Sequence, residues 1–211
     1  LSFDPVTNAA SGAYVLVVAP QHPARSVGEL VRLASAAARR PGYASAGVGT
    51  TIHLAGELFR RSAGIELVHV PYQGAARAMT ELMSGQVDMM LATLFTAMPQ
   101  IRGGRLRGLG VTSAARSRLA PDLPTLAESG VAGYDVTGWY GFVAPAGLAD
   151  GVRRRLHQDI VATLRSAAGE ERMTAQGLEV VANAPAEFGA FIRSETAKWT
   201  RVVREAGLRA E

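Results

Sequence analysis

Cysteine is absent from the 211-residue sequence, which excludes disulfide bonds and thiolate-ligated metal sites. Apolar runs of the roughly 18 residues needed to cross a membrane are absent too, and the longest, AYVLVVAP, has the length of a β-strand. The first residues show neither Met nor a signal peptide, so we expect a trimmed or processed chain. A hydrophobic content of 48% is nonetheless ample for a buried core.

Lysine is scarce as well, because Lys198 is the single lysine among 22 basic residues. The arginines that supply the formal net charge of +4 are scattered and alternate with acidic rather than aromatic residues. No zinc-finger, RNP-like or helix-turn-helix pattern accompanies them. We therefore predict a solvated basic surface and no nucleic-acid partner.

A regular alternation of strand-like and helix-like patterns fills most of the chain. The strand-like segments are residues 13–19, 43–46, 66–70, 87–92, 106–112, 135–145 and 178–182. Amphipathic stretches of helical length separate the first five, and a capping box from Ser26 to Glu29 opens the first of these helices. The stretch 95–104 is typical of a broken helix, and the last third of the chain is mainly helical. This alternation predicts an α/β fold with a mostly parallel sheet and helices on both faces.

Residues 43–59, YASAGVGTTIHLAGELF, place two glycines and two threonines between a short strand and a helix. Gly47 and Gly49 allow close approach of the backbone, Thr50 and Thr51 supply hydroxyls, and the first N–H groups of a helix favour an anion. A carboxylate suits this turn, since each charge-assisted hydrogen bond contributes about 1.5–3 kcal/mol. A plain N-capped helix is the alternative interpretation.

Two enzymatic interpretations fit the same stretch less well. The dinucleotide fingerprint G-x-G-x-x-G is broken at Ile52, and Glu66 alone is weak support for a ribose contact. A nucleophile elbow is broken at Tyr43, where a glycine should stand. A small α/β hydrolase using Ser45 is kept as the alternative function.

The histidines add no recognised catalytic or metal motif. His53, His69 and His157 stand in no triad order that would serve Ser45. His53 and Glu57 share a helix face, but one such pair does not make a metal site, and a capping or packing role is favoured. We expect no metal and no cofactor.

Three long segments settle the choice between these interpretations: VHVPYQGAARAMTELMSGQVDMM, GRLRGLGVTSAARSRLAPDLPTLAESGVAGYDVTGWYGFVAPAG and AEFGAFIRSETAKWTRVVREAG. Together with the 43–59 stretch they closely resemble the Bug family, the extracytoplasmic solute receptors of tripartite tricarboxylate transporters. The resemblance covers the chain from Asp4 onward. It implies a periplasmic-binding-protein-like, two-lobed clamshell that captures a small carboxylate and delivers it to a membrane transporter of that type, without catalysis or cofactor.

The resemblance also implies a ligand site in which backbone amides, hydroxyls and water hold the carboxylate. Carried over by position, that site comprises Ser45, Gly49, Thr50, Thr51, His53, Tyr72, Gly74, Ala75, Ala92, Thr93, Trp139 and Tyr140. Core packing is the alternative role for Tyr72 and Trp139. Many relatives carry Asp or Asn where this chain has Ala92, so we predict a ligand without an amino group.

The family chain begins well before this one, so the resemblance implies that the first lobe is incomplete. Residues 1–19 and 139–211 would be the remnant of that lobe, and residues 20–138 the second lobe. We expect the apolar stripes over 152–164 and 188–203 to be partly exposed, and the chain to pair with a second copy. A ligand-free remnant or a sensor is the remaining alternative.

Overall fold

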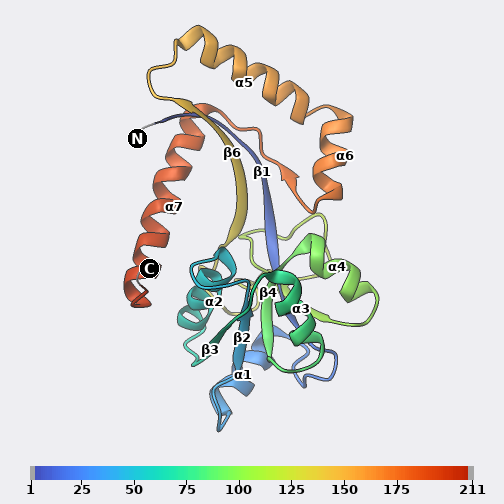
Figure 1. Cartoon of the computed structure of the whole chain (residues 1–211). Helices are drawn as coiled ribbons and strands as arrows, with labels where there is room; N and C mark the ends of the chain where they lie inside the picture. Colours follow the sequence, from blue (N-terminus) through green and yellow to red (C-terminus); the bar gives the residue numbers. More distant parts are fainter. Residues whose placement is uncertain (1–2, 209–211) are drawn as a thin grey trace. The chain divides into compact units, whose positions relative to one another are not determined.

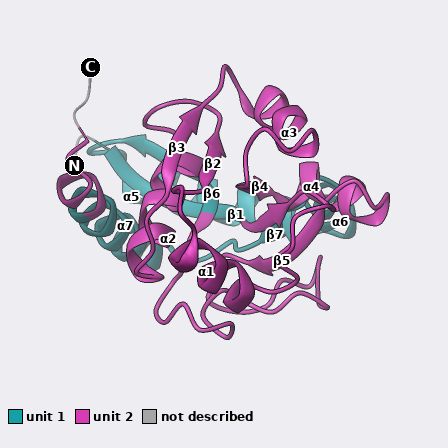
Figure 2. Ribbon diagram, turned by 90° about the horizontal axis from the view of Figure 1, so that it is seen from below, with its two compact units in different colours: residues 1–12, 138–201 teal, residues 13–137, 202–211 magenta. Residues whose placement is uncertain are grey.

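The structure, a computed structural model, describes residues 3–208 (Figure 1). This part of the chain divides into two compact units, coloured separately in Figure 2. Unit 1 holds residues 3–12 and 138–201, and unit 2 holds residues 13–137 and 202–208. The lobes expected from the sequence stay a prediction, and their ends at residues 1–2 and 209–211 lie outside the described residues.

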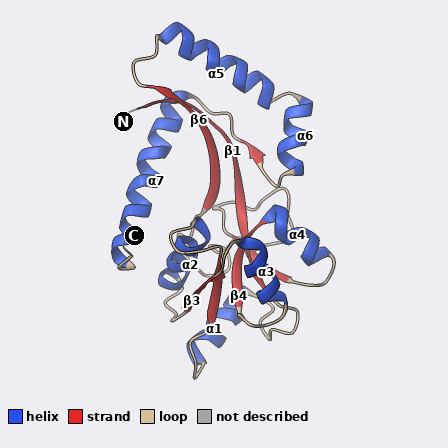
Figure 3. Cartoon of the chain, viewed as in Figure 1, coloured by secondary structure: helices blue, strands red, loops and turns tan. Residues whose placement is uncertain are grey.

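Strands and helices alternate along most of the described chain (Figure 3). The strands are β1 (Phe3–Val18), β2 (Gly42–Ser45), β3 (Val68–Pro71), β4 (Met89–Thr93), β5 (Arg107–Val111), β6 (Thr137–Pro145) and β7 (Glu179–Val180). The helices are α1 (Val27–Ala36), α2 (Thr51–Ser62), α3 (Ala75–Met83), α4 (Leu94–Arg102), α5 (Asp150–Leu164), α6 (Ala167–Ala175) and α7 (Pro185–Glu205). The sequence patterns had not separated α6 from its neighbours.

Unit 2 is built on a sheet in the strand order β3-β2-β4-β1-β5. The strand β2 pairs in parallel with β3 on one side and with β4 on the other. The chain moves outward from β2 to β3 and then back across β2 to β4, so right-handed crossovers place α2 and α3 on opposite faces. The predicted α/β class with helices on both faces is confirmed.

The long strand β1 corrects two details of the prediction. The strand was expected only over residues 13–19, because Asn, Ala, Ser and Gly at positions 8–12 are weak strand formers. Pairing overrides that weak propensity, since Ala10 and Ser11 form a ladder with β7. The second half of β1 runs antiparallel to β4 and β5, so the sheet is mixed and not mostly parallel.

The predicted cap of the first helix is present, whereas the break predicted in a later helix is not. Ser26 Oγ accepts the Glu29 N–H at 3.2 Å, while the Glu29 carboxylate accepts the Arg25 N–H at 2.7 Å, one residue before the cap. The stretch expected as a broken helix is the continuous helix α4, with Pro99 inside it. Proline lacks only one N–H there, and a nine-residue helix tolerates that loss on the surface.

Unit 1 combines the first part of β1 with β6, β7 and the helices α5 and α6 and most of α7. A small core joins Ala9, Leu164 and Ala182, with Ile160, Val161, Met173 and Val180 packed against it. Thr7 Oγ1 donates to the Asn183 carbonyl at 2.8 Å, and Asn183 Oδ1 accepts the Asn8 N–H at 2.9 Å. These bonds fasten β1 to the segment that leads into α7.

The two faces of β6 differ in how they are covered. Trp139 packs edge-on against Phe188 and Phe191 of α7, with ring centroids 5.7 and 5.5 Å apart, and a side chain at Gly141 would collide with the Phe188 ring. Tyr140 and Phe142 alternate with these residues along β6 and are exposed by 62% and 48%. β6 is therefore packed against α7 around Trp139 and Gly141, while Tyr140, Phe142 and Val143 are exposed.

The expected exposure of two apolar helix stripes is half right. Val152 and Leu156, in the first half of α5, are exposed, whereas Leu164 at its end is buried. In α7, Phe188 and Ile192 are buried and Phe191 and Trp199 are half-buried, so this stripe is covered more than expected. The reason is the open space that Gly141 leaves on β6, which admits the Phe188 ring.

Candidate ligand-binding site

Three helices of unit 2 begin at one edge of its sheet. The strands β2, β3 and β4 run in the same direction, and each is followed, after at most five residues, by α2, α3 or α4. Their carboxyl ends therefore meet at a single edge, beside the point where the strand order reverses, which is where open α/β sheets bind ligands. The three strand–helix junctions have no charged side chain: they are the turns AGVGT (46–50) and YQG (72–74), and TLFT (93–96), where β4 passes directly into α4.

The turn between β2 and α2 is held by side chains. Gly47 and Gly49 have φ of 135° and 77°, a conformation that residues with a Cβ rarely adopt. Thr50 is the N-cap of α2: its hydroxyl donates to the Gly47 carbonyl at 2.8 Å and accepts the His53 N–H at 3.4 Å. The Gly49 N–H donates to His53 Nδ1 at 3.0 Å, so this N–H is already occupied. Thr51, the first residue of α2, is exposed.

Ser45 closes β2 beneath this turn and is fully buried. Its Oγ lies 2.6 Å from His69 Nε2 and 3.1 Å from both the N–H and the carbonyl of Gly47. The Ser45 carbonyl accepts the Tyr72 N–H at 3.0 Å, which ties the end of β2 to the end of β3. Ser45 therefore joins the two turns.

A stack of aromatic rings fills the space between the sheet and α2. The His53 and His69 rings lie face to face, with centroids 3.7 Å apart and planes 9° apart. Tyr43 stacks on His69 at 5.0 Å, and its hydroxyl donates to Glu57 Oε1 at 2.7 Å. A side chain at Gly56 would overlap the Tyr43 ring, so glycine is required there. Glu57 pairs with Tyr43 and Arg60 rather than with His53, and the capping role favoured for His53 is confirmed.

Burial sets the charge state of this stack. Desolvation, helped by the neighbouring His53, lowers the pKa of His69 to about 4. Desolvation also lowers the pKa of His53, against a weaker opposing effect of Glu57. Burial and the hydrogen bond to Glu57 raise the pKa of Tyr43. Both histidines are therefore neutral near pH 7, and the stack carries no cation that would attract a ligand carboxylate.

The start of α3 differs from that of α2 in its free donors. Gly74, with φ of 99°, occupies the N-cap position, and its N–H donates to the carbonyls of Ala46 and Tyr72 at 3.3 and 3.0 Å. Within residues 3–208, no side chain caps this helix. The first N–H groups of α3, beginning at the half-buried Ala75, are therefore available to an external acceptor.

The end of β4 supplies the third part of the edge. Ala92 is buried and pairs with Val15 of β1. Thr93 is exposed and caps α4, accepting the Thr96 N–H at 3.3 Å. Phe95 follows in the first turn of α4 and is 51% exposed. This side of the edge is therefore apolar apart from hydroxyl groups.

Two of the residues predicted for the site, Trp139 and Tyr140, belong to unit 1. Trp139 packs on α7, which is the core role that the sequence analysis kept as its alternative. The ten other predicted residues all lie in unit 2, on β2 and β4 or on the turns and helix starts that follow β2 and β3. Their role in ligand binding stays a prediction.

Sequence reasoning missed the residues that support the turn from below. Tyr43 was considered only as a departure from an enzyme motif, and Gly56 not at all. The parallel register that places Tyr43 beside His69 was not visible in the sequence, although both are aromatic residues in short strands. The available signal was Gly56 in the interior of the predicted helix, directly before Glu57, since an interior helical glycine often marks close packing.

Metal ligands and membrane-crossing helices are not found in the part of the chain that the structure describes. No group of three or more His, Asp or Glu side chains lies close enough together there to hold a metal ion. The helices there also fall short of the length and apolar content of a membrane span.

Comparisons with known proteins match this architecture. The sequence profile described as Tripartite tricarboxylate transporter family receptor matches residues 2–208. The UPF0065 protein of the tcbD-tcbE intergenic region in a Pseudomonas species is 36% identical over 99% of this chain and 62% of its own length. BugT of Bordetella pertussis is 31% identical over 96% of this chain and 62% of its own length.

Solved structures of related proteins share the fold of this chain. An R. palustris protein solved with adipate is 32% identical, with a TM-score of 0.83 over 98% of this chain and 69% of that one. The periplasmic binding protein BugD is 30% identical, with a TM-score of 0.81 over 99% of this chain and 71% of that one. MatC from Rhodopseudomonas palustris, with bound malate, is 26% identical, with a TM-score of 0.79 over 95% of this chain and 69% of that one.

The fold thus defines an α/β protein of the periplasmic-binding-protein type, as predicted. The chain belongs to the tripartite tricarboxylate transporter receptor family, and the resemblance to the Bug proteins is confirmed. It spans about three fifths of the length of the curated relatives it matches, 62% in the two described above.

Proposed function

We propose that this chain is the ligand-binding part of a periplasmic receptor, which captures a small carboxylate and presents it to a membrane transporter of the tripartite tricarboxylate type. It has no catalytic role and uses no cofactor. The observation that carries the proposal is the edge of unit 2 where three helices start: its strand–helix junctions have no charged side chain, and no side chain of residues 3–208 caps the first N–H groups of α3.

Backbone donors suit a carboxylate here for an electrostatic reason. The first turn of a helix presents N–H groups together with the positive end of its dipole, and an anion satisfies both. Each charge-assisted hydrogen bond contributes about 1.5–3 kcal/mol, so two of them support binding without an arginine. The α2 start can add the N–H groups of Thr51 and Ile52, while Gly49 is held by His53.

The apolar side chains at this edge indicate the ligand class. Val48 lies between the two glycines of the first turn, Phe95 lies at the start of α4, and both are exposed. Ala92 offers no carboxylate or amide at the end of β4, so a ligand ammonium group would be left without an acidic partner there. We infer a dicarboxylate with an apolar body and no amino group. The relatives solved with adipate and with malate support this class.

One observation supports the hydrolase alternative, and a stronger one opposes it. Ser45 Oγ lies 2.6 Å from a histidine nitrogen, as a nucleophile would. However, Ser45 is fully buried and its hydroxyl is bonded to both backbone groups of Gly47, so no substrate carbonyl can reach it. Incubation with generic ester substrates tests this directly, and we expect no turnover above that of a Ser45→Ala variant.

Exposed apolar side chains in unit 1 support the expected self-association. Tyr140 and Phe142 are exposed on β6, and Val152 and Leu156 are exposed on α5. We propose that this 211-residue chain pairs with a second copy through these residues, because burying each large apolar side chain stabilises by about 1.5–3 kcal/mol. Light scattering at micromolar concentration tests the pairing, and a monomer at all concentrations would exclude it.

A thermal-shift screen tests the proposed ligand class. Glutarate, adipate and malate are compared with glutamate, acetate and ethylammonium. We expect the dicarboxylates to raise the melting temperature, since a ligand at about 100 times its dissociation constant stabilises by about 2.7 kcal/mol. Isothermal titration of the best ligand then gives its affinity. A chain that responds to none of the acids would instead be the ligand-free remnant.

A further inference from the structure

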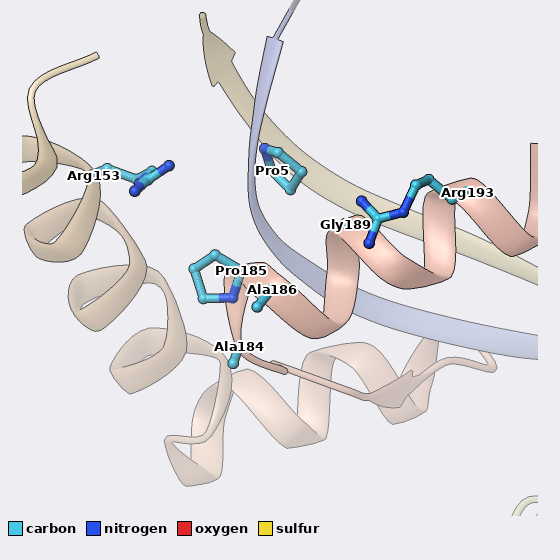
Figure 4. Close-up of a pocket in the computed structure, with 7 residues that line it drawn as sticks. All are labelled: Pro5, Arg153, Ala184, Pro185, Ala186, Gly189 and Arg193. Atoms are coloured by element: carbon cyan, nitrogen blue, oxygen red, sulfur yellow. The ribbon is translucent and has the colours of Figure 1, made fainter. Parts of the chain in front are cut away.

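Unit 1 contains a hollow that the proposed carboxylate site does not use. Its volume is about 560 Å³, within the range of about 300–1,000 Å³ typical of small-molecule pockets. It is lined by Pro5 of β1, Arg153 of α5, Ala184, and Pro185, Ala186, Gly189 and Arg193 of α7 (Figure 4). All of these residues belong to unit 1.

Two guanidinium groups reach into this hollow from opposite sides. In Figure 4, Arg153 extends from α5 and Arg193 from α7, and each points toward the space between these helices. Arg193 lies over Gly189, where an added Cβ would stand 3.6 Å from its Nη1. No hydrogen bond or ion pair holds the Arg193 side chain within the described residues. Arg153 pairs with Asp150 through Nη2 at 2.7 Å, which leaves most of its five donors open.

Three acidic residues close in sequence to the lining, Asp4, Asp150 and Glu187, each have a partner. Asp4 accepts the Gly147 N–H at 3.2 Å, and Glu187 accepts the Ala184 N–H at 3.0 Å. Asp150 is the only one of the three that forms an ion pair with an arginine of the hollow. The remaining lining is proline, alanine and glycine, so the hollow offers two cations on an apolar wall.

The walls of the hollow are held in place on two sides. His157, one turn after Arg153 on α5, contacts the Asn183 carbonyl through Nε2 at 3.1 Å. Asn183 is in turn bonded to Thr7 and Asn8 of β1. These contacts link all three elements that line the hollow. The backbone segments that carry the two arginines are therefore held in place without a ligand.

We propose that this hollow is a second anion site, which binds a small organic acid with its carboxylate attracted by the charges of Arg153 and Arg193 and its apolar part against Pro5, Pro185 and Ala186. Arginine suits this role because its planar fork matches a carboxylate. The site is independent of the proposed carboxylate site in unit 2.

Titration with hexanoate tests the proposal, followed by the arginine Nε–Hε signals in nitrogen-15 spectra of the whole chain. We expect the Arg153 and Arg193 signals to move together and to saturate. Acetate has a carboxylate but no apolar chain, and inorganic phosphate has a negative charge but neither a carboxylate nor an apolar chain. Both should therefore bind about tenfold more weakly than hexanoate. Phosphate binding as tightly as hexanoate would overturn the assignment to organic acids.

Matched variants separate a built site from general basic charge. Arg153→Gln with Arg193→Gln should weaken hexanoate binding about tenfold or more. The control pair Arg154→Gln with Arg201→Gln removes the same charge from the same two helices, outside the hollow, and should leave binding unchanged. Equal losses in both pairs would overturn the proposal. Circular dichroism checks that all four changes, which lie on the surface, leave the fold intact.

An independent variant acts in the opposite direction. Asp150→Asn removes the carboxylate that competes for Arg153 and should tighten hexanoate binding about threefold. Unchanged or weaker binding would contradict the role of Arg153. A Gly74→Val variant in unit 2 should leave hexanoate binding in unit 1 as it is, so failure of the proposed function does not affect this result.

Discussion

Two glycine turns leave the same edge of the unit 2 sheet, yet their donors are used differently. In the turn at residues 46–50, the hydroxyls of Ser45 and Thr50 and the imidazole of His53 all hydrogen-bond to the backbone. In the turn at residues 72–74, backbone carbonyls alone hold Gly74, and no side chain within residues 3–208 caps the helix that follows. A capped helix start supports a site, and an uncapped one offers donors to a ligand.

The difference between the two turns changes which helix start we expect to bind the carboxylate. The sequence placed the carboxylate on the start of α2, at Thr50 and Thr51. The structure shows that Thr50 and His53 already bind the turn itself. We therefore expect the turn at 46–50 to shape the site and the start of α3 to supply its strongest donors.

The largest effect should come from Gly74→Val. A valine at φ of 99° is strained, and its side chain would enter the open space above the edge, where nothing lies within 4 Å. Loss of one or two charge-assisted hydrogen bonds lowers the affinity for glutarate about hundredfold, as measured by isothermal titration. Gly49→Val should also weaken binding, but by deforming the supporting turn and with an additional loss of stability.

Gly64→Val is the matched control for both changes. Gly64 follows α2 with φ of 63° and open space around it, away from the edge. Its substitution costs about 1–3 kcal/mol of backbone strain, as at Gly74, but should leave the affinity for glutarate unchanged. If Gly74→Val binds glutarate as well as Gly64→Val does, the start of α3 is not part of the site.

The second effect concerns pH and the supporting turn. The folded pKa of His69 is about 4, while an unfolded histidine titrates near 6.5, so protons bind the unfolded chain first as pH falls. Stability is therefore complete above about pH 6.5, decreases between about 6.5 and 4, and levels off below that. The loss from pH 7.5 to pH 5 is about 2 kcal/mol for His69 alone, and His53 adds to it.

Urea unfolding at the two pH values measures this difference. His69→Phe keeps an aromatic ring in the stack but cannot bind a proton, so its stability should depend less on pH than that of the parent chain. A His69→Phe variant whose stability falls with pH as steeply as that of the parent chain would show that His69 is not the titrating element.

The sequence predicted the edge better than it predicted the network beneath it. Turn glycines, capping threonines and uncharged loops are local signals, and they located Gly49, Thr50, Gly74 and Thr93 at strand–helix junctions. The stack of Tyr43, His53 and His69 depends on which strands are neighbours and in what register, and short strands do not encode this locally. The same limit explains β1, whose first half is held by pairing with β7 and not by its own propensity.

A smaller effect should separate the two threonines at the start of α2. Thr50→Val removes the hydroxyl that caps His53 and bonds to Gly47, and should cost about 1 kcal/mol of unfolding free energy. Thr51→Val removes an exposed hydroxyl one residue later and should change stability by less than about 0.5 kcal/mol. Equal losses would mean that the cap does not fasten the turn.

The smallest effect concerns the choice between glutarate and glutamate. The two ligands differ by one ammonium group, and the strand ends of unit 2 present no acidic side chain to receive it, since Ala92 and Thr93 end β4. Partial desolvation of that group without a partner should favour glutarate about fivefold, or about 1 kcal/mol, in a competition titration.

Thr93→Asp adds a carboxylate at an exposed N-cap, where Asp is well tolerated, and should remove the preference. Thr80→Asp, on the exposed side of α3, is the control and should leave it in place. A parent chain that binds glutamate more tightly than glutarate would mean that another group at the site accepts the ammonium, and that Ala92 does not set the ligand class.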